Sequence, residues 1–143
     1  MPTPSLVIFK FKIGHYNGSM GLNFFNKDIL IKEIPSFTET EFVITENIEF
    51  PTTIYFDVFG KDKFDTDVDE NNNILADKYI QLTDLIVDKA PIHILSLIKL
   101  CKLETNDKIL YNNYWGFNGR VTINFEEVNS FLWHMKHLKN VDE

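Results

Sequence analysis

Residues 6–13 read Leu6-Val7-Ile8-Phe9-Lys10-Phe11-Lys12-Ile13, and their alternation decides the fold class. From Val7 onward every second residue is apolar, and two lysines fall between the last three of them. Successive side chains of a β-strand point to opposite faces, so this pattern predicts a strand with one buried and one wet face.

The same alternation recurs along the chain, with turn residues between the segments. We expect further strands over residues 29–34, 41–48, 53–59, 78–87, 110–117 and 120–126. Residues 92–103 have helical spacing after Pro91, which predicts one short helix. Residues 14–21 are interpreted as an open loop. Residues 128–138 fit either a helix or a strand, and we favour a strand. The sequence therefore predicts a single all-β domain over residues 1–143, a jelly-roll-like β-sandwich of about eight strands.

Acidic residues are concentrated in the middle of the chain. The net charge is −7, and residues 57–88 hold nine acidic and three basic side chains, a net charge of −6. Arg120 is the only arginine. Proteins that bind nucleic acid neutralise phosphates with clustered Lys and Arg, so this distribution argues against nucleic acid as a partner.

The N-terminal residues Met1-Pro2-Thr3-Pro4 lack the basic and then apolar pattern of a secretory signal. No apolar run approaches the roughly 20 residues that cross a bilayer. We therefore expect a protein that is made in the cytosol and does not insert into membranes.

An acidic stretch, residues 64–77, places Asp and Asn at alternate positions between two expected strands. Alternate oxygen ligands suit a hard cation such as Ca²⁺. The spacing copies the start of an EF-hand loop, but Glu70 replaces its glycine and Ala76 its bidentate Glu, which excludes that motif. Two interpretations stay open, a solvated polar loop and a Ca²⁺ site whose ligands would be Asp65, Asp67, Asp69 and Asp77.

Asn118-Gly119 is the strongest turn signal, and it predicts a type I′ hairpin between residues 110–117 and 120–126. One face of that hairpin would combine aromatic rings with amides, hydroxyls and a charge. Its members would be Tyr111, Trp115, Phe117, Arg120, Thr122, Asn124 and Glu126. Such a face suits a protein contact, a glycan contact or cover by another segment, and these three interpretations stay open.

The sequence contains no nucleophile elbow, phosphate-binding glycine loop or zinc-protease motif. Cys101 has apolar neighbours, which predicts a buried and inert thiol. Enzyme activity is not expected.

A resemblance to known families rests on several segments. They are Gly60-Lys61, Asp65-Thr66, Val68-Asp69, Asn73-Ile74, Asp77-Lys78-Tyr79-Ile80 and Tyr114-Trp115-Gly116-Phe117-Asn118-Gly119. Over residues 50–135 the chain resembles small β-sandwich proteins of tailed bacteriophages. It is also similar to calcium-dependent carbohydrate-binding modules. The first resemblance implies a virion structural or accessory protein, such as a capsid decoration or tail-associated adhesion module, that binds neighbouring virion proteins or copies of itself. The second implies, as the alternative, a Ca²⁺-dependent module with a glycan as partner.

Overall fold

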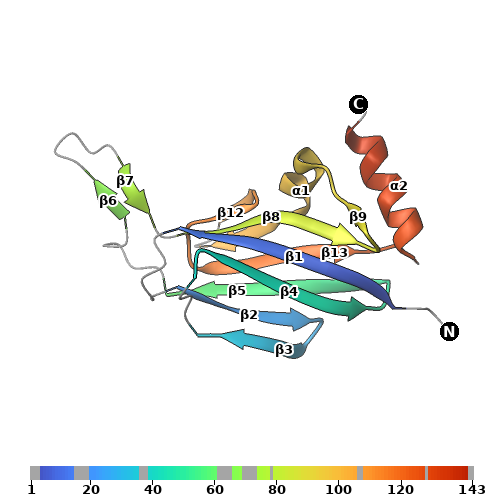
Figure 1. The fold of residues 1–143 in the computed structure, drawn as a ribbon, viewed down its shortest axis with the longest axis horizontal. Coiled ribbons are helices and arrows are strands. Elements are labelled where there is room, and N and C mark those ends of the chain that lie inside the picture. Colours follow the sequence, from blue (N-terminus) through green and yellow to red (C-terminus); the bar gives the residue numbers. More distant parts are fainter. Residues whose placement is uncertain are drawn as a thin grey trace.

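A computed structural model describes residues 4–14, 20–35, 39–60, 66–68, 74–77, 79–105, 108–127 and 129–141. Two antiparallel sheets pack face to face, which confirms the predicted β-sandwich (Figure 1). Within these ranges no helix is long and apolar enough to cross a bilayer.

The five-stranded sheet follows the order β12-β8-β1-β4, and β9 pairs with β8. Its strands are β1 (Ser5–Gly14), β4 (Glu41–Ile48), β8 (Tyr79–Val87), β9 (Ala90–Pro91) and β12 (Tyr114–Trp115). In β1 the alternating residues of the opening stretch are all buried, as the pattern predicts.

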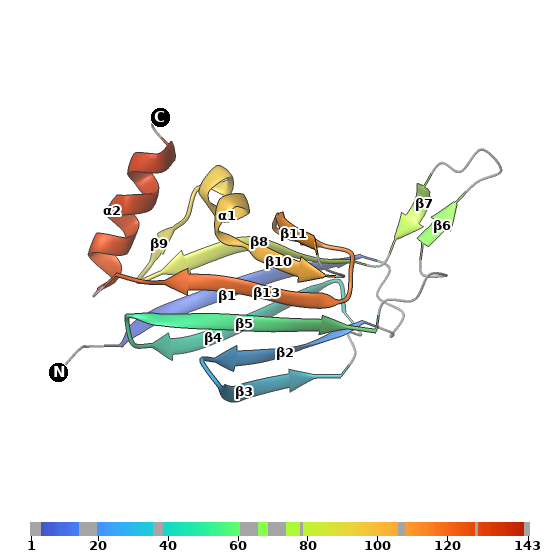
Figure 2. The same ribbon diagram turned by 180° about the vertical axis from the view of Figure 1, so that it is seen from behind.

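The six-stranded sheet follows the order β11-β10-β13-β5-β2-β3. Its strands are β2 (Gly21–Asn26), β3 (Ile29–Ile34), β5 (Thr52–Phe59), β10 (Lys102–Thr105), β11 (Lys108–Tyr111) and β13 (Gly119–Phe125). Figure 2 shows this sheet toward the viewer, and none of the described elements crosses in front of it.

Two helices and a hairpin complete the described chain. The helices α1 (Ile94–Leu100) and α2 (Ser130–Val141) lie along one edge of the sandwich. The strands β6 (Thr66–Val68) and β7 (Ile74–Asp77) pair only with each other and project from one end (Figure 1).

Aromatic rings from both sheets fill the core. Phe9 of β1 meets Phe24 and Phe56 of the other sheet edge to face, with ring centroids 5.6 and 5.3 Å apart. Edge-to-face pairs add to the free energy gained by burying apolar area. Interlocked rings therefore fix how the sheets sit on each other.

Three sequence expectations are wrong in detail. Residues 128–138 lie mostly in the helix α2 and not in a strand, because the Asn129 side chain accepts a hydrogen bond from the Leu132 amide and starts a helix. The strand β2 is missing from the expected strands: it begins at Gly21 and buries Leu22 and Phe24, while residues 15–19 of the expected loop lie outside the described residues. The predicted helix 92–103 ends at Leu100, and the chain continues as the strand β10.

One carboxylate joins both ends of the described chain. Asp88 accepts hydrogen bonds from the amide of Leu6 on β1 (3.0 Å) and from the hydroxyl of Ser130 on α2 (2.5 Å). Asp88 and Lys89 have φ of 50° and 70°, the conformation of a type I′ turn. The turn between β8 and β9 therefore anchors the first strand and the last helix.

Candidate binding face

The predicted hairpin at Asn118-Gly119 does not form. β12 belongs to one sheet and β13 to the other, so residues 116–118 cross between the sheets. Gly119 is needed for a different reason, because a Cβ there would lie 2.4 Å from the carbonyl oxygen of Glu104 on β10. The glycine permits close approach of two strands and not a two-residue turn.

Trp115 is a core residue, so its assignment to a contact face is wrong. Its side chain is 0% exposed and packs against Phe11 and Phe56. The indole N–H donates to the carbonyl oxygen of Asn112 at 2.8 Å. Phe117 is 52% exposed but lies in the connection 116–118 and not on a strand.

We name the side of the six-stranded sheet that points away from the core the outer face. The other predicted contact residues on the strands of this sheet lie on it. Leu103, Val121 and Ile54 point into the core, so their strand neighbours point outward. The strand register then places Arg120 and Asn124 on the outer face, together with Tyr111. The outer face also carries Phe25, Thr53, Tyr55, Asp57, Lys102, Glu104, Ile109 and Thr122.

Arg120 forms the centre of this face. Its Nε donates to Oδ1 of Asp57 at 2.6 Å, and its Nη2 donates to Oδ2 at 3.0 Å. The guanidinium lies 4.7 Å from the ring centroid of Tyr55 and 5.7 Å from that of Phe25. The hydrogen bond to Asp57 raises the pKa of Arg120 above its ordinary value. A bidentate ion pair on two rings holds the side chain in one orientation.

Two further polar pairs lie on the same face. The Thr53 hydroxyl donates to the side-chain oxygen of Asn124 at 3.0 Å. Lys102 and Glu104 of β10 form an ion pair at 3.6 Å. The face therefore combines rings, hydroxyls and an amide with charges that are paired with each other.

Sequence reasoning missed Tyr55, Asp57 and Phe25 as members of this face. The alternation over residues 53–59 indicates that Tyr55 and Asp57 point away from the core. It does not indicate that β5 pairs with β13 and β2, because those contacts join residues far apart in sequence. The register of long-range pairs was the missing signal.

The proposed metal ligands fall largely outside the described residues. Asp65 and Asp69 lie outside them, as do the side chains of Asp67 and Asp77. The backbones of Asp67 and Asp77 belong to β6 and β7, where Asp67 faces Ala76. The stretch predicted as a loop therefore contains a hairpin. Among the residues whose side chains are described, no group of three or more His, Cys, Asp or Glu could hold a metal ion.

The hairpin β6–β7 and the Arg120 cluster lie toward the same end of the sandwich. Asp57 lies near the end of β5, and the chain then continues toward β6. Figure 2 shows the hairpin projecting from the end at which β5 finishes and β13 begins. The described hairpin strands β6 and β7 therefore lie toward the same end of the sandwich as Asp57 of the outer face.

No protein-family model matches the chain, and the curated proteins give no match. Among solved structures it is similar to "vCBM60 in complex with galactobiose", with 9% sequence identity, a TM-score of 0.51 and coverage of 83% of this chain and 97% of that one. A selenomethionine form of vCBM60, described with "two families of calcium-dependent carbohydrate binding modules", gives 8% identity, a TM-score of 0.45 and coverage of 84% and 90%. The first likeness agrees with the β-sandwich.

Proposed function

We propose that this protein is a non-catalytic carbohydrate-binding module that holds its ligand on the outer face. One observation carries the proposal, the Arg120–Asp57 pair seated on the rings of Tyr55 and Phe25. Rings and a flat guanidinium offer apolar surface to the C–H face of a sugar. Adjacent N–H and hydroxyl groups can hydrogen-bond to sugar hydroxyls.

The rigidity of the cluster supports this function. Ordering a free arginine on binding costs side-chain entropy, about 0.5–1.5 kcal/mol for a rotamer-rich side chain. Asp57 and the two rings already hold Arg120 in place, so little of that cost remains. The likeness in fold to a structure that holds galactobiose is consistent with the proposal.

A glycan array with the whole chain tests this proposal. We expect binding that Tyr55→Ala weakens at least tenfold, because the ring under Arg120 is lost. Phe131→Ala is the matched control, since Phe131 is 69% exposed on α2 and lies off the outer face. Circular dichroism of each variant checks folding. An array without any hit would contradict the proposal.

We extend this proposal to a Ca²⁺ ion bound by the acidic stretch. Asp65, Asp67, Asp69 and Asp77 supply the oxygen ligands that Ca²⁺ prefers. A bound cation would offset the repulsion among these carboxylates. Calcium would then support sugar binding indirectly, and chelation should weaken any glycan signal.

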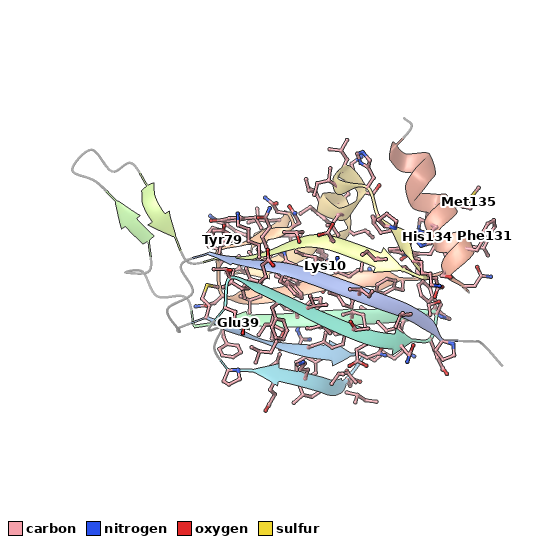
Figure 3. The ribbon with its side chains drawn as sticks, viewed as in Figure 1. Lys10, Glu39, Tyr79, Phe131, His134 and Met135 are labelled. Carbon is pink, nitrogen blue, oxygen red and sulfur yellow. The ribbon has the colours of Figure 1, made fainter. Side chains whose placement is uncertain are left out.

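A second candidate is a virion subunit that acts through protein contacts. The observation favouring it is apolar side chains exposed on α1, β11 and α2. Phe131 and Met135 of α2 point away from the sheets (Figure 3). The exposed set includes Ile94, Leu95, Ile109, Leu110, Phe131, Leu132 and Met135. Exposed apolar surface of this kind is typical of protein contacts.

Sedimentation and binding to phage particles test the second candidate. A virion subunit should self-associate or bind a particle protein, and Phe131→Ser with Met135→Ser should weaken that contact. A monomer without affinity for any particle protein would contradict it.

A further inference from the structure

The outer face contains one row of side chains that runs across five strands. Cross-strand partners link Tyr111 to Lys102, Lys102 to Thr122, Thr122 to Tyr55, and Tyr55 to Phe25. We name these five residues the cross-strand row. Neighbouring strands lie about 4.8 Å apart, so Tyr111 and Tyr55 are separated by roughly 14 Å. Rings therefore lie at both ends of the row, with Lys102 and Thr122 between them.

Tyr111 is the open end of the row. Its side chain is 56% exposed on the edge strand β11, whereas Tyr55 and Phe25 are half-buried. A small ligand centred on Arg120 would contact Tyr55 and Phe25 without reaching Tyr111. Only a ligand that extends across β13 and β10 would contact both ends.

Polar groups flank the row on both sides. Two residues along the strands toward the β6–β7 end lie Glu104, Arg120 and Asp57, and Arg120 is the cross-strand partner of the other two. Two residues along in the other direction, Asn124 faces Thr53. A chain lying along the row would therefore meet the Tyr111 ring at one end, the guanidinium seated on Tyr55 and Phe25 at the other, and hydrogen-bonding groups at each edge.

The charges of this face indicate an uncharged ligand. Arg120 is paired with Asp57, and Lys102 with Glu104. A carboxylated or sulfated chain would meet Asp57 and Glu104 as well as the two cations, and like charges in contact lower affinity. Paired charges leave the face without a net attraction for either sign.

We propose that the ligand is a linear, uncharged oligosaccharide that lies across the strands from Phe25 to Tyr111. This inference rests on the proposed function, since it specifies the ligand of the same face. Affinity then rises with chain length until the chain reaches Tyr111, because each added sugar contacts a further part of the row.

Calorimetry with the full chain tests the inference. The probes are neutral linear galacto-, xylo- and gluco-oligosaccharides, each from the disaccharide to the hexasaccharide. For the series that binds, we expect affinity to rise by about tenfold or more with length, equivalent to about 1.4 kcal/mol. Tyr111→Ala should abolish that rise without changing the Kd of the disaccharide. Phe117→Ala, which removes an exposed ring outside the row, should leave the rise intact.

The outcomes separate this inference from the proposed function. Equal affinity for disaccharide and hexasaccharide, or tighter binding of uronate chains than of neutral ones, would overturn the extended neutral ligand and leave sugar binding in place. No binding of any glycan would overturn both. A dimer in sedimentation that Tyr111→Ala dissociates would identify the face as a protein contact, and would also overturn the inference.

Discussion

Arg120 is expected to matter for the proposed glycan binding and to contribute little to folding. In its ion pair with Asp57, the arginine side chain is 48% exposed and the aspartate side chain is 33% exposed. Exposed pairs contribute little to stability, because water screens them. The order that Asp57 gives the guanidinium therefore matters mainly for what the outer face can hold.

Arg120→Lys separates these two roles. Lysine keeps the charge but loses the bidentate geometry and the flat surface above Tyr55. We expect the free energy of unfolding to change by less than about 1 kcal/mol and glycan affinity to fall at least tenfold. Urea denaturation and calorimetry provide the measurements. Lys136→Ala, which removes an exposed ion pair between α2 and Glu126, is the control. Unchanged affinity would contradict the role of Arg120.

Trp115 has the opposite character, because it is fully buried among rings of both sheets. We expect Trp115→Ala to lower the free energy of unfolding by about 3–5 kcal/mol, the usual cost of deleting a large core ring. Denaturation in urea measures the loss. Phe117→Ala, two residues along and half exposed, should change stability little. A Trp115→Ala protein as stable as the parent would contradict a core position.

Among the secondary structure elements, α2 is attached to the sandwich by contacts of its first described side chains. Trp133 is its one residue with a fully buried side chain among those described, and its indole N–H donates to the carbonyl oxygen of Asn124. The Asp88–Ser130 hydrogen bond holds the start of the helix. Partial burial acts to raise the pKa of Asp88, but hydrogen bonds from Ser130, Ser5 and Leu6 outweigh it and lower the pKa below its ordinary value.

Because folding lowers the pKa of Asp88, this carboxylate makes the folded state less stable as the pH falls. The stabilisation from Asp88 is complete above its unfolded-state pKa of about 3.9 and is lost as pH falls through the lower folded-state value. We expect stability to fall more steeply below pH 4 in the parent than in Asp88→Asn. Urea midpoints between pH 6 and 2.5 measure this, with Asp84→Asn, on the strand β8 that precedes the turn, as a control. Identical pH profiles for parent and Asp88→Asn would rule out the assignment.

The elements also explain which parts of the fold the sequence could reveal. β1 and β5 alternate strictly because one face meets the core and the other meets water. α2 buries Trp133 while Phe131 and Met135 stay exposed, so its apolar residues do not mark its buried face. The candidate site was harder still, because Tyr55, Asp57 and Arg120 meet only through the register of β5 and β13.

At the scale of the whole molecule, the sequence concentrates negative charge in residues 57–88. The described strands of the acidic stretch, β6 and β7, project beyond the end of the sheets at which β5 finishes (Figure 1). Like charges gathered in this way destabilise the folded state unless a cation is present. The proposed calcium site would make the folded chain bind Ca²⁺ more tightly than the unfolded chain.

Calcium should therefore raise the midpoint of thermal unfolding, because an ion that binds only the folded state stabilises it by mass action. We expect a rise of several degrees at millimolar calcium, reversed by chelator and absent in Asp65→Asn with Asp67→Asn. Asp84→Asn, which removes a carboxylate outside the stretch, should keep the shift. An unchanged midpoint at millimolar calcium would remove the metal from the proposed function.

The Asp88 turn also determines how the protein would respond to mechanical load. A force applied between the first strand and the last helix enters one sheet directly at β1, and it acts on α2 at the hydrogen bond from Ser130 to Asp88 and at the buried ring of Trp133. The helix should detach once this hydrogen bond breaks and Trp133 leaves its contacts with Phe50 and Phe125. The sheets, whose strands are joined by ladders of backbone hydrogen bonds, would then bear the load together. Under tension the molecule would lengthen by one helix while the outer face stayed assembled.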